Sequence, residues 1–330
     1  MQALAELKQR LGGLIGRTQQ PVLGIDIGSH ILKITALTLH QGRLSVLAAC
    51  QIALPEGAVR GHKILDPGTV AGSIITLLRK TGIKAGRAVV GLPSVEASIK
   101  TFSLDMGFVE VDEVSVEQHL LNEMTPYVAY PAENIRLDYE FLRPASGAQD
   151  ISVLVAATSA EVVLNYQTVL AQAGLQPQCL ELEQYALLRA YAYFDAKAWQ
   201  DKPNPCIALL DFGAQYAAIT VIEADEVLYT DEQVIRLEGQ NPAEFVQQWA
   251  ARALTLFYTS GLRSEVDGVV LLGGRLDLEK DSVSLLKASL RLPVIWGDPF
   301  VNMKQLGVID GNKHSYALSC GLALRGLQHD

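Results

Sequence analysis

The stretch from Val22 to Lys33, VLGIDIGSHILK, decides the fold of this chain. Mostly apolar residues lead into Asp26-Ile27-Gly28-Ser29, and a second apolar segment follows at Ile31–Leu39. This pattern predicts a strand, a tight turn and a second strand, with a carboxylate near the end of the first strand. A glycine in such a turn lets the backbone approach an anion, and the N–H groups of the turn suit phosphate oxygens. Asp26 is therefore a candidate to hold Mg²⁺ through water.

The same pattern occurs a second time at Cys206–Gln233, where an apolar strand leads into Asp211-Phe212-Gly213 and two further strand patterns follow. The first copy also has a third strand pattern, at Leu44–Ile52. One such turn is common, but a three-stranded unit repeated in the two halves of a chain indicates a fold built from two related lobes. We therefore expect Asp26 and Asp211 to face each other across a cleft.

Length and composition favour a folded chain with two lobes. The 330 residues are 49% hydrophobic and 19% charged, which is typical of a well-packed protein. The sequence shows no signal peptide and no apolar run of the roughly 20 residues that a membrane span needs. A formal net charge of −9 argues against general nucleic-acid binding. The four cysteines lack metal-ligand spacing and are interpreted as reduced core residues of a cytosolic protein.

We expect three segments along the chain. Residues 1–20 place leucines at helical spacing with basic residues between them, so they form an amphipathic segment that lies on an anionic membrane surface or a loosely docked helix. Lobe I covers residues 21–195, with an inserted β/α subdomain at about 94–144, and lobe II covers residues 203–330. The nearly continuous apolar run at 151–157 predicts a strand of the main sheet, covered on both faces.

The candidate phosphate site combines the two turns with a lysine and a glycine pair. The expected N–H donors are Gly28, Ser29 and His30 in one turn and Gly213, Ala214 and Gln215 in the other. Lys33 would reach a terminal phosphate if its side chain faces the cleft, and is otherwise a solvated strand lysine. Gly273-Gly274 follows a buried strand pattern and allows close approach of a nucleotide. No catalytic residue is predicted, because no nucleophile and base have a recognisable spacing.

The chain resembles the actin/Hsp70/sugar-kinase superfamily and, within it, the PilM-type proteins of type IV pilus assembly, which are relatives of the cell-division protein FtsA. The resemblance extends over nearly the whole chain from about residue 21 and rests on the duplicated hairpin together with the segments GIDIGSHILKI, PYVAYPAENIRLDYEFL, AGLQPQCLELEQYALLRAY, LLDFGAQYAAITV and GLALRG. It implies an α/β, two-lobed, actin/Hsp70-like (ribonuclease H-like) fold with an FtsA-type subdomain inserted in lobe I.

The resemblance also implies an ATP and Mg²⁺ site. By matching position, the first phosphate loop is Asp26, Gly28, Ser29 and Lys33, the second is Asp211, Gly213 and Gln215, and the adenosine loop is Gly273-Gly274, with Asp26 and Asp211 toward the metal. The chain departs from the family pattern in lobe II, where a glycine pair is reduced to Glu238-Gly239, the following helical subdomain is short, and Arg275 follows Gly274. Because less surface would cover a base, we expect nucleotide binding to be weak or absent.

The implied function is that of a cytoplasmic adaptor, peripheral to the inner membrane and at most a weak ATPase. In this family the groove beside the inserted subdomain receives the cytoplasmic N-terminal tail of the membrane protein PilN as an extended peptide, and other pilus assembly proteins are further partners. The alternatives are a small-molecule (sugar-type) kinase, a filament-forming actin relative, and a nucleotide-free pseudo-ATPase scaffold of a related pilus or secretion system. The sequence leaves these alternatives open.

Overall fold

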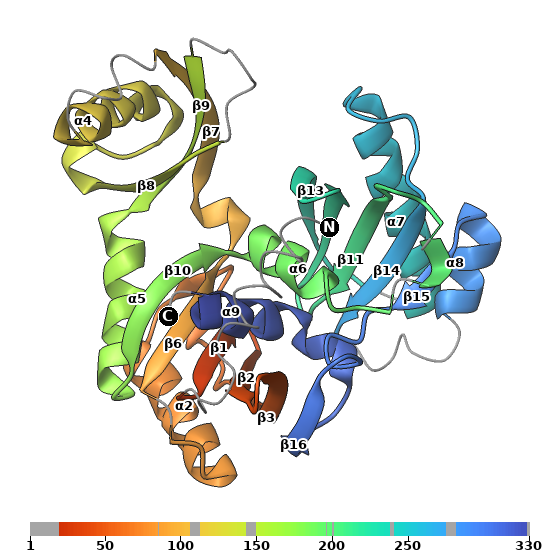
Figure 1. The fold of residues 1–330 in the computed structure, drawn as a ribbon, viewed down its shortest axis with the longest axis horizontal. Coiled ribbons are helices and arrows are strands. Elements are labelled where there is room, and N and C mark those ends of the chain that lie inside the picture. The colour runs from red at the N-terminus through yellow and green to blue at the C-terminus, as the bar shows by residue number, and fades with distance from the viewer. Residues whose placement is uncertain are drawn as a thin grey trace.

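A computed structural model describes residues 20–84, 86–105, 113–142, 150–195, 197–199, 201–237, 241–274 and 282–328 of the chain (Figure 1). The expected amphipathic segment, apart from Gln20, lies outside the described residues, as do Glu238-Gly239 and Arg275. None of the helices in the described ranges is long and apolar enough to cross a bilayer.

Lobe I is built on a six-stranded sheet with the order β10-β6-β1-β2-β3-β16. The predicted meander consists of β1 (Val22–Ile27), β2 (Ile31–His40) and β3 (Arg43–Ala53), which are antiparallel neighbours. On the other side of β1, β6 (Arg87–Leu92) and β10 (Gln176–Leu182) pair in parallel. Helices α2 (Pro67–Thr81) and α5 (Ala160–Gln172) pack their apolar faces on one side of this sheet.

Lobe II repeats this topology in a five-stranded sheet with the order β13-β12-β11-β14-β15. Its meander is β11 (Cys206–Phe212), β12 (Tyr216–Glu223) and β13 (Glu226–Val234), and β14 (Gly268–Gly273) and β15 (Val294–Trp296) follow in parallel. The order matches β3-β2-β1-β6-β10 of lobe I, which confirms the duplication predicted from the two turns. Helices α7 (Pro242–Thr259) and α8 (Ser282–Leu290) pack on the outer face.

Two helices lie between the sheets and join the lobes (Figure 1). These are α6 (Glu183–Tyr191) and α9 (Ala317–Gln328). One apolar cluster contains Val89 of lobe I, Ala186 of α6, Leu322 of α9, and Ile207 and Val270 of lobe II, all of them fully buried. Because both lobes and both helices contribute to a single core, this cluster joins the lobes through buried apolar contacts.

The inserted subdomain is a three-stranded antiparallel sheet, β7-β9-β8, covered on one face by α4 (Glu113–Met124). It stands apart from both lobes at the upper left of Figure 1. Its strands are β7 (Ser98–Asp105), β8 (Ile135–Phe141) and β9 (Asp150–Ser159). The prediction that 151–157 belongs to the main sheet is therefore wrong, and the subdomain extends past residue 144. The apolar run at 151–157 resembles a strand of a parallel core, but here it belongs to the central strand of a small sheet that α4 covers on one face.

The sequence did not predict β16 (Lys304–Ile309), which leaves lobe II and pairs with β3 at the edge of the lobe I sheet. Helix α9 then packs on β1, β2 and β6. The C-terminal part of the chain thus contributes to both lobes, in contrast to the expected division at residue 203. The six residues of β16, KQLGVI, are largely exposed and show no strict alternation of polar and apolar types that would identify a strand.

The remaining elements are short. They are the hairpin of β4 (Val59–Arg60) and β5 (Lys63–Ile64) and single turns of 3₁₀-helix at Ser94–Glu96, Thr125–Tyr127, Ala132–Asn134, Lys197–Trp199 and Lys313–Tyr316. All four cysteines carry free thiols; Cys50, Cys206 and Cys320 are buried and Cys179 is partly exposed.

Candidate functional site

The two predicted phosphate turns close in the same way. The N–H of Gly28 donates to the carbonyl of Ile31 at 3.2 Å, and the N–H of Gly213 donates to the carbonyl of Tyr216 at 2.9 Å. A Cβ on Gly28 would lie 2.8 Å from the Ile31 oxygen, and one on Gly213 would lie 3.2 Å from the Tyr216 oxygen. Each glycine is therefore needed for the close approach of the turn.

This geometry changes the set of phosphate donors. The N–H groups of Gly28 and Gly213 are used within their own hairpins, so the expectation that they donate to phosphate is not met by this conformation. In the described structure, four other turn N–H groups donate to no backbone carbonyl: those of Ser29, His30, Ala214 and Gln215. These four remain as backbone donors for an anion.

Next to each turn, one residue from each of the three strands forms a row across the sheet. In lobe I the cross-strand neighbours are Asp26, Lys33 and Gln51. In lobe II the corresponding neighbours are Asp211, Ala218 and Glu232. Since cross-strand neighbours share one face of a sheet, both rows present their side chains together.

Lys33 faces the cleft rather than bulk water. Its ammonium donates to the carboxylate of Asp26 at 2.8 Å, and the two side chains are 14% and 9% exposed. Burial lowers the pKa of Lys33, but the charges of Asp26 and Asp211 outweigh it, so this pKa lies above its usual value. Lys33 is therefore a charged group shared by carboxylates from both lobes.

The same charges show that Asp26 and Asp211 approach each other across the cleft. Burial raises the pKa of Asp211 to about 6; Lys33 lowers this pKa, whereas the charges of Asp26 and Glu232 raise it. Interactions between charges weaken with distance, so the charges that shift the pKa of Asp211 belong to neighbouring groups. The structure thus brings the two predicted aspartates together with Lys33.

The glycine pair lies beside the second turn. Gly273 is the strand neighbour of Phe212 and has a φ of 103°, which glycine adopts without strain. A Cβ on Gly274 would lie 3.9 Å from the terminal carbon of the Lys33 side chain. The pair therefore lies beside the Lys33 side chain, where the absence of a Cβ leaves more room.

Sequence reasoning missed Glu183, the first residue of α6. Burial raises the pKa of Glu183 well above its usual value, and the charges of Asp26 and Asp211 raise it further. The segment LELEQYALLRAY contains two candidate glutamates, and only the structure separates them. Glu181 makes a bidentate ion pair with Arg189 at 2.7 and 2.8 Å. Glu183 instead lies close enough to Asp26, Asp211 and Lys33 for their charges to act on its pKa.

The residues present fit a magnesium nucleotide. Asp26, Asp211 and Glu183 all act on the single ammonium of Lys33, and burial raises the pKa values of Asp211 and Glu183, so a divalent cation would favour the charged forms of these carboxylates. Among the described residues no three His, Cys, Asp or Glu side chains converge at metal-binding distance. A Mg²⁺ here would keep most of its waters and be held by one or two carboxylates and by phosphates, which is its usual preference.

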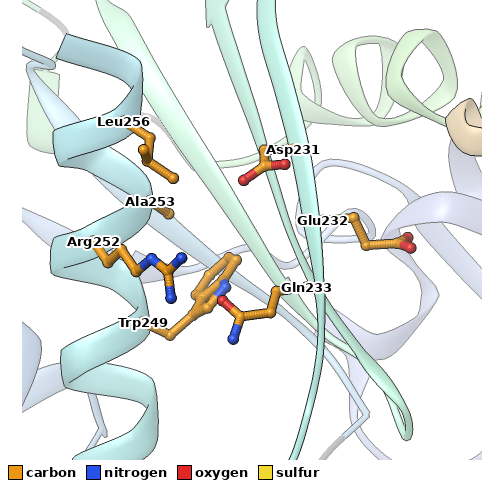
Figure 2. A pocket seen from close by; sticks show the side chains of 7 residues that line it. All are labelled: Asp231, Glu232, Gln233, Trp249, Arg252, Ala253 and Leu256. Atoms are coloured by element: carbon orange, nitrogen blue, oxygen red, sulfur yellow. The ribbon is translucent and has the colours of Figure 1, made fainter. Parts of the chain in front are cut away.

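A separate pocket of about 230 Å³ lies on the other face of β13. Figure 2 shows Trp249, Arg252 and Leu256 of α7 on one side of it and Asp231 and Gln233 of β13 on the other. The carboxylate of Glu232 points away from α7 in this view. The pocket and the phosphate cleft therefore occupy opposite faces of the lobe II sheet.

Known proteins share this architecture. The family described as "Type IV pilus assembly protein PilM" matches residues 24–241. A chain of the solved "PilM-PilN type IV pilus biogenesis complex" is 21% identical with a TM-score of 0.72, over 93% of this chain and 98% of that chain.

Two further solved structures are more distant. EutJ, an ethanolamine utilization protein from Carboxydothermus hydrogenoformans, is 13% identical with a TM-score of 0.51, over 97% of this chain and 98% of that one. A protein of unknown function with an actin-like ATPase fold, from Bacteroides thetaiotaomicron, is 11% identical with a TM-score of 0.50, over 92% and 97%. The predicted actin-like fold is thereby confirmed.

Proposed function

Because this chain belongs to the PilM family of type IV pilus assembly proteins, we propose that it is an actin-like adaptor on the cytoplasmic side of the inner membrane. In this role the inserted subdomain docks the cytoplasmic N-terminal tail of a PilN-like membrane protein. The observation that carries the proposal is the placement of this subdomain, which stands apart from the lobes and leaves one sheet face without a covering helix among the described residues (Figure 1).

Exposed apolar side chains occur in the segments at the junction between the subdomain and lobe I. Val95, Tyr127 and Leu164 are 59%, 49% and 61% exposed, and they lie on the segments that surround the base of the three-stranded sheet. Ser98 at the start of β7 donates to the carbonyl of Tyr127 at 3.0 Å, which holds Tyr127 at this base. Exposed apolar side chains at such a junction are candidates for contact with a partner.

An extended peptide suits this junction. Both β7 and β8 are edge strands within the described part of their sheet, and an edge strand is where an added strand pairs. Binding of this kind uses main-chain hydrogen bonds for affinity and side-chain pockets for specificity. The proposed ligand is therefore an unstructured tail with apolar side chains at alternate positions.

The test is the affinity of the full chain for a fluorescent peptide that copies the PilN tail of the same organism. Leu164→Asp is expected to weaken binding by about tenfold or more, since it places a charge in an apolar contact. The matched control is Leu306→Asp, because Leu306 is an exposed leucine on β16, at the far edge of the lobe I sheet. Equal binding by wild type and Leu164→Asp would contradict docking at this junction.

We also propose that the cleft between the lobes binds ATP with Mg²⁺, weakly, as a structural ligand. Lys33 would move from Asp26 to a phosphate, and Ser29, His30, Ala214 and Gln215 would donate their backbone N–H groups. A bound Mg²⁺ would supply positive charge to Asp26 and Asp211. Titration calorimetry with MgATP tests this proposal. Micromolar affinity that is abolished by Asp26→Ala would contradict the proposal that binding is weak. No binding at millimolar ATP would contradict the proposal that the cleft binds ATP. Asp26→Ala should leave tail binding unchanged.

A further inference from the structure

The β4–β5 hairpin of lobe I ends in an unusual two-residue turn. Gly61 and His62 have φ values of 53° and 69°, so both lie in the left-handed region that a type I′ hairpin turn requires. Glycine and asparagine are the usual residues there, and a histidine in this conformation is strained relative to them. Val59 and Ile64, which flank the turn, are buried in the lobe I core, so the tip is held firmly by its base.

The ring of His62 crosses to lobe II. Its Nε2 lies 2.7 Å from a carboxylate oxygen of Glu232, and its ring centroid lies 4.2 Å from that of Tyr216. The His62 and Glu232 side chains are only 17% and 21% exposed. The backbone of the tip is also close, because a Cβ on Gly61 would lie 3.4 Å from the Tyr216 hydroxyl. His62 of lobe I therefore contacts two residues of lobe II, Glu232 and Tyr216.

Both lobe II partners belong to the phosphate site. The carbonyl of Tyr216 closes the second phosphate turn by accepting from Gly213. Glu232 stands in the same cross-strand row as Asp211, on the face of β13 that points away from α7 (Figure 2). A movement of His62 away from lobe II would therefore act directly on the turn and the carboxylates that face a nucleotide.

Two of the places where the lobes meet differ in chemistry. Around α6 and α9 the connection is a fully buried apolar core, which separates only at a large free-energy cost. At the hairpin tip it is a hydrogen bond and one ring contact, whose polar partners water can solvate again. A lasting connection at one place and a breakable one at another is the arrangement of a hinge and a latch.

We propose that the Gly61-His62 tip is a latch that holds the lobes closed over the phosphate cleft by binding Glu232 and Tyr216. Its effect on nucleotide exchange depends on the nucleotide binding proposed above, whereas its effect on lobe closure does not. With the latch closed, nucleotide enters and leaves slowly. Release of His62 lets the lobes rotate about the α6–α9 core.

The test is the distance between the lobes in solution, measured without nucleotide by electron–electron double resonance. Spin labels are placed on the exposed faces of α2 and of the loop after α7, as Thr76→Cys and Leu262→Cys. His62→Asn keeps a residue that tolerates the left-handed turn but removes the ring and its contacts. The matched control is His40→Asn, at the end of another lobe I hairpin.

His62→Asn and Glu232→Gln are each expected to lengthen and broaden the distance distribution, while His40→Asn leaves it unchanged. A distribution for His62→Asn that coincides with that of wild type would overturn the latch. A second measurement follows the dissociation of a fluorescent ATP analogue, which we expect to be about fivefold faster or more in His62→Asn. If wild type binds no nucleotide, the proposed nucleotide site fails, and the distance measurement still decides the latch.

Discussion

The two copies of the strand–turn–strand unit share one backbone arrangement but differ in the balance of acidic and basic side chains. The lobe I row is Asp26, Lys33 and Gln51, in which one acid meets one base. The lobe II row is Asp211, Ala218 and Glu232, in which two acids meet no base. Lys33 and Ala218 occupy the same place in the two copies, so the difference is one of side chains and not of register.

The difference shows how the copies depend on each other. Lobe I supplies the positive or hydrogen-bonding groups for lobe II: Lys33 acts on Asp211, and His62 binds Glu232. Neither acid of the lobe II row has a basic partner within its own row. Closing the lobes is therefore the step that compensates the lobe II carboxylates, and the predictions below change one side of this comparison at a time.

The largest effect is expected from Lys33→Met. Removing the ammonium leaves Asp26 buried without its partner and removes the charge that lowers the pKa of Asp211. Loss of one member of a buried pair destabilises a protein by about 3–5 kcal/mol. Urea unfolding at pH 7 measures the loss, which should shrink toward pH 4 as the carboxylates take up protons. Lys33→Arg keeps the charge and is the control; a loss below about 1 kcal/mol for Lys33→Met would contradict the compensation.

Asp211→Asn is expected to stabilise the chain in the absence of nucleotide. The pKa of Asp211 is raised to about 6, so between the unfolded value near 4 and pH 6 the folded state binds more protons and stability falls as pH rises. The variant removes this loss and should gain on the order of 1–3 kcal/mol at pH 7, but nothing below pH 4.

The control for this variant is Asp231→Asn, because Asp231 is exposed on the other face of β13. Urea unfolding from pH 4 to pH 7 gives the profile of each variant. A gain for Asp211→Asn that is equal at all pH values would show that the charge of Asp211 is not its cause.

Ala218→Lys makes the lobe II row a copy of the lobe I row. The new ammonium would lie between Asp211 and Glu232, and we expect a gain of about 1 kcal/mol at pH 7. The gain should disappear in the Asp211→Asn background, which a double-mutant cycle by urea unfolding measures. A gain that persists in that background would assign it to packing instead.

The smallest expected difference separates the two turn glycines. A Cβ at Gly28 would lie 2.8 Å from a backbone oxygen, whereas one at Gly213 would lie at 3.2 Å. Gly28→Ala should therefore destabilise by about 1–2 kcal/mol, and Gly213→Ala by less, since a smaller shift relieves the contact. Thermal unfolding compares the two variants directly. A larger destabilisation for Gly213→Ala than for Gly28→Ala would show that the lobe I turn shifts more easily to accommodate a Cβ than its shorter distance suggests.

Much of the fold follows from local sequence. The strand–turn–strand patterns at Asp26 and Asp211 specify strands, turns and antiparallel register, because alternation and turn chemistry act within about ten residues. The strand at 151–157 is also recognisable, but its sheet is not, since its partners β7 and β8 and the cover of α4 depend on tertiary packing. The edge strand β16 has no pattern, because its pairing with β3 specifies it.

The candidate site divides in the same way. The sequence by itself determined the duplication, the turn glycines, Asp26, Asp211 and Lys33, because each belongs to a unit whose geometry is local. Only the tertiary structure decided that Glu183 enters the cleft, that Lys33 serves both lobes, and that His62 reaches Glu232. These contacts join residues far apart in the chain, and their free energies depend on burial and charge, which exist only after the lobes have packed together.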